Sequence, residues 1–227
     1  MNTHPGPAQP SQTVHNTAKV NVGHERVNWW HDPPLRLRLS ATTPQSWSAD
    51  KLGGVRRRLL RAYFALPGVR ARRGVSAARA WRRSRTKLFV CHGNICRSPF
   101  AERYASRLAT DGRTLASAGY HPIMGRTSPD EAVTAAARWQ VDLVEHRSCV
   151  LTQAMIRWAD AIFVFDDQDY RRVRKAHPSA RGRVHLLATI EPHGPPLIAD
   201  PYAGPVGAFE QTYERIAGII EGSGHGR

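Results

Sequence analysis

From residue 87 onward, short apolar runs alternate with segments in which apolar positions recur every three or four residues. The short runs are typical of buried strands, and the three-to-four spacing predicts amphipathic helices. The predicted strands are residues 87–91, 114–117, 161–165 and 183–187. The predicted helices are residues 99–110, 129–138, 152–158 and 167–176, followed by a last helix that carries Val206, Phe209, Tyr213, Ile216 and Ile220. This alternation predicts an α/β fold: a small four-stranded parallel sheet with helices on both faces.

The residues before this alternation follow a different pattern. Residues 1–50 are polar and rich in proline, without sustained periodicity, which predicts a disordered tail. Residues 51–85 are a basic extension, predicted to contain an amphipathic helix that is broken at Pro67-Gly68 and followed by a second arginine cluster. The apolar positions of that helix are Leu52, Val55, Leu59, Tyr63 and Leu66. We therefore divide the chain into a tail (1–50), the basic extension (51–85) and an α/β domain (86–227).

The net charge of +15 belongs almost entirely to the residues before the α/β domain. Residues 1–86 carry 16 Lys and Arg against 3 Asp and Glu, whereas residues 87–227 carry 17 against 15. The α/β domain is therefore nearly neutral, and the basic charge is no argument that this domain binds nucleic acid. A basic amphipathic helix suits an anionic membrane surface or a nucleic acid, and a contact of residues 51–85 with either one is left open.

Cysteine content and the lengths of apolar runs indicate the cellular compartment of the protein. Three cysteines, two of them in one short loop, do not form a disulfide framework. No apolar run has the length of a signal peptide or a membrane span. We therefore expect a cytoplasmic protein.

One segment, from Val90 to Pro99, carries the candidate chemistry. It joins the strand 87–91 to a helix for which Ser98 is the predicted N-cap, so backbone N–H groups and the positive end of the helix dipole converge on an anion site. Facing those donors and Arg97, the thiol of Cys91 is expected to have a lowered pKa. The planar guanidinium of Arg97 suits two phosphate oxygens, and a thiolate beside a bound phosphate is a nucleophile for phosphorus.

A leaving oxygen needs an acid, and Asp200 is the best candidate because it lies in a Pro/Gly-rich loop just before the last helix. The same carboxylate can then act as base for the water that hydrolyses a phosphocysteine. The sequence therefore predicts hydrolysis of phosphomonoesters through a phosphocysteine intermediate, with no metal and no other cofactor.

The Cys-x5-Arg-Ser segment after the first strand, together with Asp200-Pro201 before the last helix, resembles the low-molecular-weight protein tyrosine phosphatases over roughly residues 86–222. The resemblance implies that Cys91 is the nucleophile, Arg97 holds the phosphate and Asp200 is the acid. It also implies a phosphate-binding loop completed by His92, Gly93, Asn94, Ile95, Cys96 and Ser98. The implied partner is a phosphotyrosine-containing protein, with a bacterial tyrosine kinase as one candidate.

The same resemblance assigns supporting roles. The Ser98 hydroxyl would steady the thiolate, and Asn94 would hold a strained loop backbone through hydrogen bonds to Ser117 and His146. Cys96 would trap the oxidised nucleophile as a reversible disulfide, against the alternative that it only fills space. Tyr202 and Tyr120 are the candidate contacts for a substrate ring, although the aromatic wall departs from the family pattern. Asp166 and Asp167 end the strand 161–165 on the active-site side, where the family often has an acidic residue, and capping of the next helix is the simpler explanation for them.

Three other readings of the sequence stay open. Arsenate reductases share the loop, but they relay oxidation to further cysteines near the third strand, and residues 163–176 contain none. An arginine phosphatase branch has a similar loop, but it tends to carry threonine where this chain has Ile95, and this difference disfavours that branch. A non-catalytic protein that binds through its basic N-terminal region would have no need of Cys91, Arg97 and Asp200 together.

Overall fold

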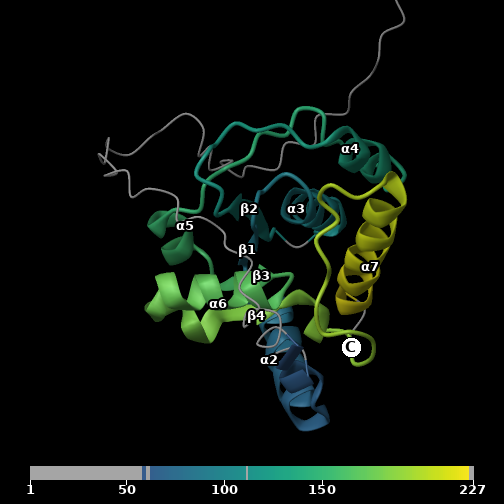
Figure 1. Cartoon of the computed structure of the whole chain (residues 1–227). Helices are drawn as coiled ribbons and strands as arrows, with labels where there is room; N and C mark the ends of the chain where they lie inside the picture. Colours follow the sequence, from purple (N-terminus) through teal and green to yellow (C-terminus); the bar gives the residue numbers. More distant parts are fainter. Residues whose placement is uncertain (1–57, 60–61, 111, 225–227) are drawn as a thin grey trace, which may run out of the picture. The chain divides into compact units, whose positions relative to one another are not determined.

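Four parallel strands form one sheet in the order β2-β1-β3-β4 (Figure 1). The computed structural model describes residues 58–59, 62–110 and 112–224 of the chain. The strands are β1 (Thr86–Cys91), β2 (Thr114–Gly119), β3 (Ala161–Val164) and β4 (Val184–Leu186). The central strands β1 and β3 are buried almost throughout, as expected of a parallel sheet covered on both faces.

Helices cover this sheet on both sides. In Figure 1, α5 and α6 lie on one side of the strands, and α3 and α7 lie on the other. The helices are α2 (Pro67–Arg83), α3 (Arg97–Leu108), α4 (Asp130–Ala137), α5 (Gln153–Trp158), α6 (Asp167–Ala176) and α7 (Val206–Gly224), with short 3-10 segments η1 (Pro178–Arg183) and η2 (Leu187–Thr189). The predicted α/β fold is thus confirmed. Among the helices within the described ranges, none is both long and apolar enough to cross a bilayer.

The strand order places a ligand site at a definite edge of the sheet. From β1 the chain goes to β2 on one side, whereas β3 and β4 lie on the other side. The carboxyl ends of β1 and β3 are therefore the point where the order reverses, and such points are where open α/β sheets bind ligands. Cys91 ends β1 and pairs in register with Gly119 at the end of β2.

The predicted cap of the first helix was wrong. The helix α3 begins at Arg97 with Cys96 in the N-cap position, and no side chain caps it. Ser98 lies inside the first turn, where its hydroxyl is 3.1 Å from the Sγ of Cys91. The hydroxyl contacts the loop before the helix, so it does not cap the helix end.

The basic extension contains a helix that the sequence pattern did not predict. Expectations for residues 1–50, and for residues 51–57 of the extension, lie outside the described residues. Residues 62–65 are helical, the helix is interrupted at Leu66, and α2 begins at Pro67 and runs for 17 residues. Pro67 breaks the preceding helix as predicted. Proline also suits the first turn of a new helix, because the N–H that proline lacks would have no hydrogen-bond partner within the helix at that position.

The helix α2 packs on the sheet. Trp81 is only 5% exposed, and its ring lies 5.3 Å from that of Phe163 and 6.2 Å from that of Phe89. A Cβ on Gly74 would come within 2.8 Å of the carbonyl oxygen of Thr189, so this glycine lets α2 approach η2 closely. The Arg70 guanidinium donates hydrogen bonds to three consecutive carbonyl oxygens, of residues 191–193. The segment before residue 86 therefore contributes to the core of the α/β domain.

Truncation of Trp81 tests this packing. Trp81→Ala is expected to lower the free energy of unfolding by about 3–5 kcal/mol, because it removes a buried indole and leaves a cavity against Phe89 and Phe163. Urea denaturation of the full chain measures the loss. On the same helix, Arg79→Ala alters an exposed side chain and should change stability by less than about 0.5 kcal/mol. A Trp81→Ala protein as stable as Arg79→Ala would show that α2 does not pack on the sheet.

Candidate active site

The loop between β1 and α3 folds around the thiol of Cys91. The backbone N–H of Asn94 points to the Cys91 Sγ at 3.3 Å, and the Ser98 Oγ lies 3.1 Å from the same sulfur. Cys91 itself is buried. The sulfur therefore faces hydrogen-bond donors from its own loop, at the N-terminus of α3, which is the arrangement that stabilises an anion.

Asn94 holds the loop in this shape. Its φ of 51° lies in the left-handed region, which is strained for most residues other than glycine and which asparagine adopts more readily. Its Nδ2 donates to the hydroxyls of Ser98 and Ser117, both at 2.9 Å, and its Oδ1 accepts the backbone N–H of Cys149 at 2.7 Å. Three groups from three parts of the chain thus fix one strained residue, and the strain is confined to the loop around Cys91.

Two further groups complete this network. The Nε2 of His146 lies 2.7 Å from the carbonyl oxygen of Asn94, so this nitrogen carries the ring proton and donates it. Burial lowers the pKa of His146 to about 4, so the ring is neutral near pH 7. The Ser117 hydroxyl donates to the Glu102 Oε2 at 2.5 Å, which leaves its oxygen free to accept from Asn94. Burial raises the pKa of Glu102.

Gly119 makes room for the loop at the end of β2. A Cβ there would lie 2.8 Å from the Asn94 nitrogen and 2.9 Å from the His92 carbonyl oxygen, both backbone atoms of the loop. That same carbonyl oxygen accepts the N–H groups of Tyr120 and His121 at 2.8 and 2.9 Å. A side chain larger than hydrogen at residue 119 would therefore push the loop away from the sheet.

We expect Gly119→Ala to lower kcat/KM for p-nitrophenyl phosphate by about 10²-fold, because a displacement near 1 Å at a reacting centre has that effect. Steady-state kinetics measure the loss. The matched control is Gly218→Ala in α7, where an added Cβ meets no atom within 4 Å and alanine favours the helix. Wild-type kinetics in Gly119→Ala would contradict the close contact between residue 119 and the loop.

Arg97 lies in the same site, held by carboxylates from three positions. Its side chain is 1% exposed, with Nη1 2.8 Å from an oxygen of Asp166 and Nη2 2.9 Å from an oxygen of Asp200. An oxygen of Asp169 lies 3.7 Å from Nη2. Asp166 also accepts the N–H of Asp169 and so caps α6, as the sequence analysis expected. Burial acts to lower the pKa of Arg97, but the surrounding negative groups, led by Asp166 and Asp200, outweigh it and raise that pKa.

The contacts of Asp166 and Asp169 with Arg97 were missed by the sequence analysis. The available signal was the group of three acidic residues, Asp166, Asp167 and Asp169, that follows shortly after β3. Because β1 and β3 are parallel neighbours, the residues that follow them meet at one edge of the sheet. Acidic residues at that position were therefore candidates for pairing with an arginine from the loop after β1.

Three buried polar atoms of the residues around this site have no hydrogen-bond partner within the described part of the chain. They are the Nε of Arg97, the Oδ2 of Asp169 and the hydroxyl of Tyr120. Buried polar atoms are nearly always paired, so exceptions of this kind call for an explanation. The Nε and Nη2 of a guanidinium form one edge of its planar fork, the edge that can grip two oxygens of a phosphate. Arg97 thus keeps one donor of that edge unused.

The expected lowering of the Cys91 pKa is wrong for this arrangement. Burial raises the pKa of the thiol, and the charge of Asp169 adds to the rise, while Arg97 and the Ser98 hydroxyl act in the opposite direction. The guanidinium is shared among three carboxylates, which reduces its effect on the sulfur. The sequence showed Arg97 but not the carboxylates that surround it.

The mouth of the site combines aromatic and basic side chains. Tyr202 is 58% exposed, and its backbone N–H donates to the Asp200 Oδ1 at 3.3 Å. The guanidinium of Arg172, in α6, lies 5.3 Å from the centre of the Tyr120 ring. The Nη1 of Arg172 is 3.0 Å from the Nδ1 of His92. Arg172 was not among the predicted site residues, because its place in the middle of a helix gave no sign of it.

The remaining loop residues line the interior. Ile95 and Cys96 are buried, and burial raises the pKa of the Cys96 thiol. A Cβ on Gly93 would lie 3.2 Å from the side chain of Ile95. Cys91, Cys96 and Cys149 are all free thiols in this structure, and the disulfide between Cys91 and Cys96 stays a prediction.

Comparison with known proteins matches the sequence that contains this site to one family. The model of the family described as "Low molecular weight phosphotyrosine protein phosphatase" matches residues 87–222. The Ralstonia nicotianae protein named "Probable low molecular weight protein-tyrosine-phosphatase EpsP" is 36% identical over 132 residues, which are 58% of this chain and 88% of that protein.

Solved structures agree with the sequence comparison. The tyrosine phosphatase AmsI of Erwinia amylovora matches with a TM-score of 0.57 and 33% identity, over 61% of this chain and 89% of AmsI. The YwlE arginine phosphatase of Geobacillus stearothermophilus matches with a TM-score of 0.56 and 25% identity, over 60% of this chain and 88% of that one. The fold therefore fits both kinds of phosphatase almost equally well.

Proposed function

The chain belongs to the low molecular weight phosphotyrosine protein phosphatase family, and we propose that it dephosphorylates phosphotyrosine in proteins through a phosphocysteine on Cys91. The observation that carries this proposal is the loop around the Cys91 sulfur. There the Asn94 N–H and the Ser98 hydroxyl face the thiol, and a buried arginine with an unused Nε lies on the same loop.

In the first step, the Cys91 thiolate attacks phosphorus, the S–P bond forms and the P–O ester bond breaks. The loop N–H groups and the Nε–Nη2 edge of Arg97 would bind the phosphate oxygens. Binding at that edge displaces Asp200 from Nη2. Asp200 is the more accessible of the two carboxylates, since its side chain is 41% exposed against 21% for Asp166, and the displaced carboxyl then protonates the leaving oxygen.

In the second step, Asp200 accepts a proton from a water molecule, the oxygen of that water attacks phosphorus, and the S–P bond breaks. Inorganic phosphate leaves and the thiolate is restored. Throughout both steps the Ser98 hydroxyl can donate to the sulfur, because its oxygen already accepts from Asn94.

The state of Asp200 also bears on the thiolate. The acid role requires a proton on Asp200, and that proton removes one of the negative charges that now compensate Arg97. Arg97 then acts more strongly on the Cys91 sulfur and favours its ionised form. The acid for the leaving group and the charge on the nucleophile are therefore coupled through one guanidinium.

Phosphotyrosine is favoured over phosphoarginine by Ile95, which stands where the arginine phosphatases tend to carry threonine, and by the higher identity to AmsI. The exposed Tyr202 and the Tyr120 ring beneath Arg172 are the proposed contacts for the substrate ring. An autophosphorylated bacterial tyrosine kinase is the proposed protein substrate, since EpsP and AmsI, which resemble the chain, come from bacteria.

The test is a comparison of matched phosphotyrosine and phosphoarginine peptides, in reductant and a metal chelator, with mass spectrometry of the quenched enzyme. We expect faster release of phosphate from phosphotyrosine and a phosphoryl group on Cys91. Faster release from phosphoarginine would transfer the assignment to that substrate. Turnover without any phosphoryl group on Cys91, in a quench fast enough to hold one, would overturn the proposed mechanism. An autophosphorylated bacterial tyrosine kinase is then tested as the protein substrate in the same phosphate-release assay.

A further inference from the structure

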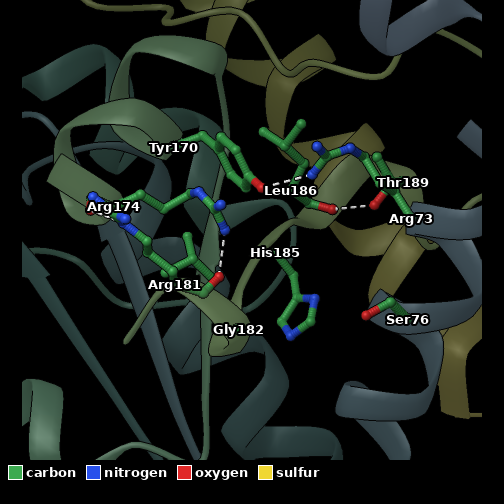
Figure 2. A pocket seen from close by; sticks show the side chains of 10 residues that line it. Arg73, Ser76, Tyr170, Arg174, Arg181, Gly182, His185, Leu186 and Thr189 are labelled. Atoms are coloured by element: carbon green, nitrogen blue, oxygen red, sulfur yellow. Dashed lines mark hydrogen bonds between the residues drawn. The ribbon is translucent and has the colours of Figure 1, made fainter. Parts of the chain in front are cut away.

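A pocket of about 210 Å³ lies between α2, α6, η1 and β4, away from the Cys91 loop (Figure 2). Its polar lining includes Arg73 and Ser76 from α2, Arg174 from α6, Arg181 from η1, His185 from β4 and Thr189 from η2. In Figure 2, the α2 side chains and the Arg174–Arg181 pair lie on opposite sides of His185. None of these residues contributes to the Cys91 site, and we call this group the α2 pocket.

The arginines of the α2 pocket are held in place by contacts that leave donors available. The Nη1 of Arg73 donates to the Tyr170 hydroxyl at 2.6 Å, and its guanidinium lies 4.9 Å from the centre of the Phe64 ring. Arg181 Nε donates to the carbonyl oxygen of Arg174 at 3.1 Å, and Arg174 donates to the carbonyl oxygen of Arg181 in return. Because these contacts already order the side chains, a ligand would lose less free energy in fixing them.

Within the described residues, no carboxylate compensates the charge of the α2 pocket. Its lining contains no aspartate or glutamate, and within the described residues no carboxylate forms an ion pair with Arg73, Arg174 or Arg181. Burial and the neighbouring Arg73 lower the pKa of His185 to about 4, so its ring is neutral near pH 7. The pocket thus offers guanidinium and hydroxyl donors to a group that only accepts hydrogen bonds.

We propose that the α2 pocket is a second anion site, which binds a phosphate group, either inorganic phosphate or the phosphoryl group of a small phosphomonoester. Guanidinium forks match phosphate oxygens, and three of them suit a doubly charged group better than a single carboxylate. The volume is below the roughly 300–1,000 Å³ of pockets for drug-sized ligands, which favours a small group. Since α2 precedes the residues matched by the family model, the part of the site that α2 supplies, Arg73 and Ser76, lies outside the matched residues.

The test is a titration of the ¹⁵N-labelled full chain, followed residue by residue by NMR. The probes are inorganic phosphate and phosphoserine, with sodium chloride at equal ionic strength as the control. The amides of residues 181–189 report on the α2 pocket, and those of residues 92–98 report separately on the Cys91 loop. The variant is Arg174→Gln with Arg181→Gln, compared with Arg138→Gln combined with Arg157→Gln, which removes the same charge from exposed positions elsewhere.

We expect saturable chemical-shift changes in the amides of residues 181–189. The affinity that they report should fall at least tenfold in the Arg174→Gln, Arg181→Gln variant and stay unchanged in the control variant. Tighter binding of phosphoserine would identify a phosphomonoester as the ligand, and tighter binding of phosphate would identify the free ion. The proposal is overturned if these amides do not shift, if sodium chloride shifts them equally, or if both variants respond as wild type does. The spectra themselves show whether each variant is folded.

Discussion

Replacing Cys91 with serine is expected to lower kcat for p-nitrophenyl phosphate by at least about 10⁴-fold, the scale of loss when a covalent nucleophile is removed. A serine hydroxyl is a far weaker nucleophile than a thiolate unless a base activates it, and the Asn94 N–H and the Ser98 hydroxyl that contact the sulfur are hydrogen-bond donors rather than bases. Inorganic phosphate should still bind, because the Asn94 N–H and Arg97 remain in place. Steady-state kinetics measure the first effect, and phosphorus-31 NMR measures the second.

A second thiol of the chain provides the matched control. Cys149→Ser makes the same chemical change outside the loop, and the hydrogen bond from residue 149 to Asn94 is made by the backbone, which the substitution retains. We expect kcat within about twofold of wild type, as for a substitution that removes no interaction with the transition state. Activity that survives Cys91→Ser would mean that phosphorus is attacked by another group, and the phosphocysteine proposal would fail.

The elements of the α/β domain could be predicted because each carries its own local pattern. The strand β1 is a continuous apolar run between polar residues, and α7 repeats its apolar positions regularly. The loop after β1 was identifiable for the same reason, since Cys91, Gly93, Asn94 and Arg97 all lie in the short segment from residue 91 to residue 97. Such features depend on neighbouring residues alone.

Features that depend on distant residues could not be predicted in this way. Nothing near Trp81 in the sequence shows that its ring meets Phe89 and Phe163, so the segment before residue 86 looked like a separate extension. The charge around Arg97 is a similar case. Its carboxylates come from residues 69 to 103 positions away, and they decide how strongly Arg97 acts on the thiol of Cys91.

Asp200→Asn is expected to lower kcat by about 10²–10⁴-fold for phenyl phosphate, the range typical of a lost general acid. For p-nitrophenyl phosphate the loss should be much smaller, because nitrophenolate is a weaker base and leaves without a proton. The dependence on the leaving group is what identifies an acid. A residue that only orients Arg97 would affect both esters equally, since both present the same phosphate.

Asp166→Asn supplies that comparison, because Asp166 pairs with Arg97 at 2.8 Å, as closely as Asp200 does at 2.9 Å. This substitution removes one of the negative charges that pair with the same guanidinium. It should therefore change kcat for the two esters by the same factor. If Asp200→Asn also changes kcat for both esters by the same factor, Asp200 is a positioning residue for Arg97 and another group is the acid. If only Asp200→Asn separates the esters, the carboxyl that now pairs with Arg97 is the group that protonates the leaving oxygen.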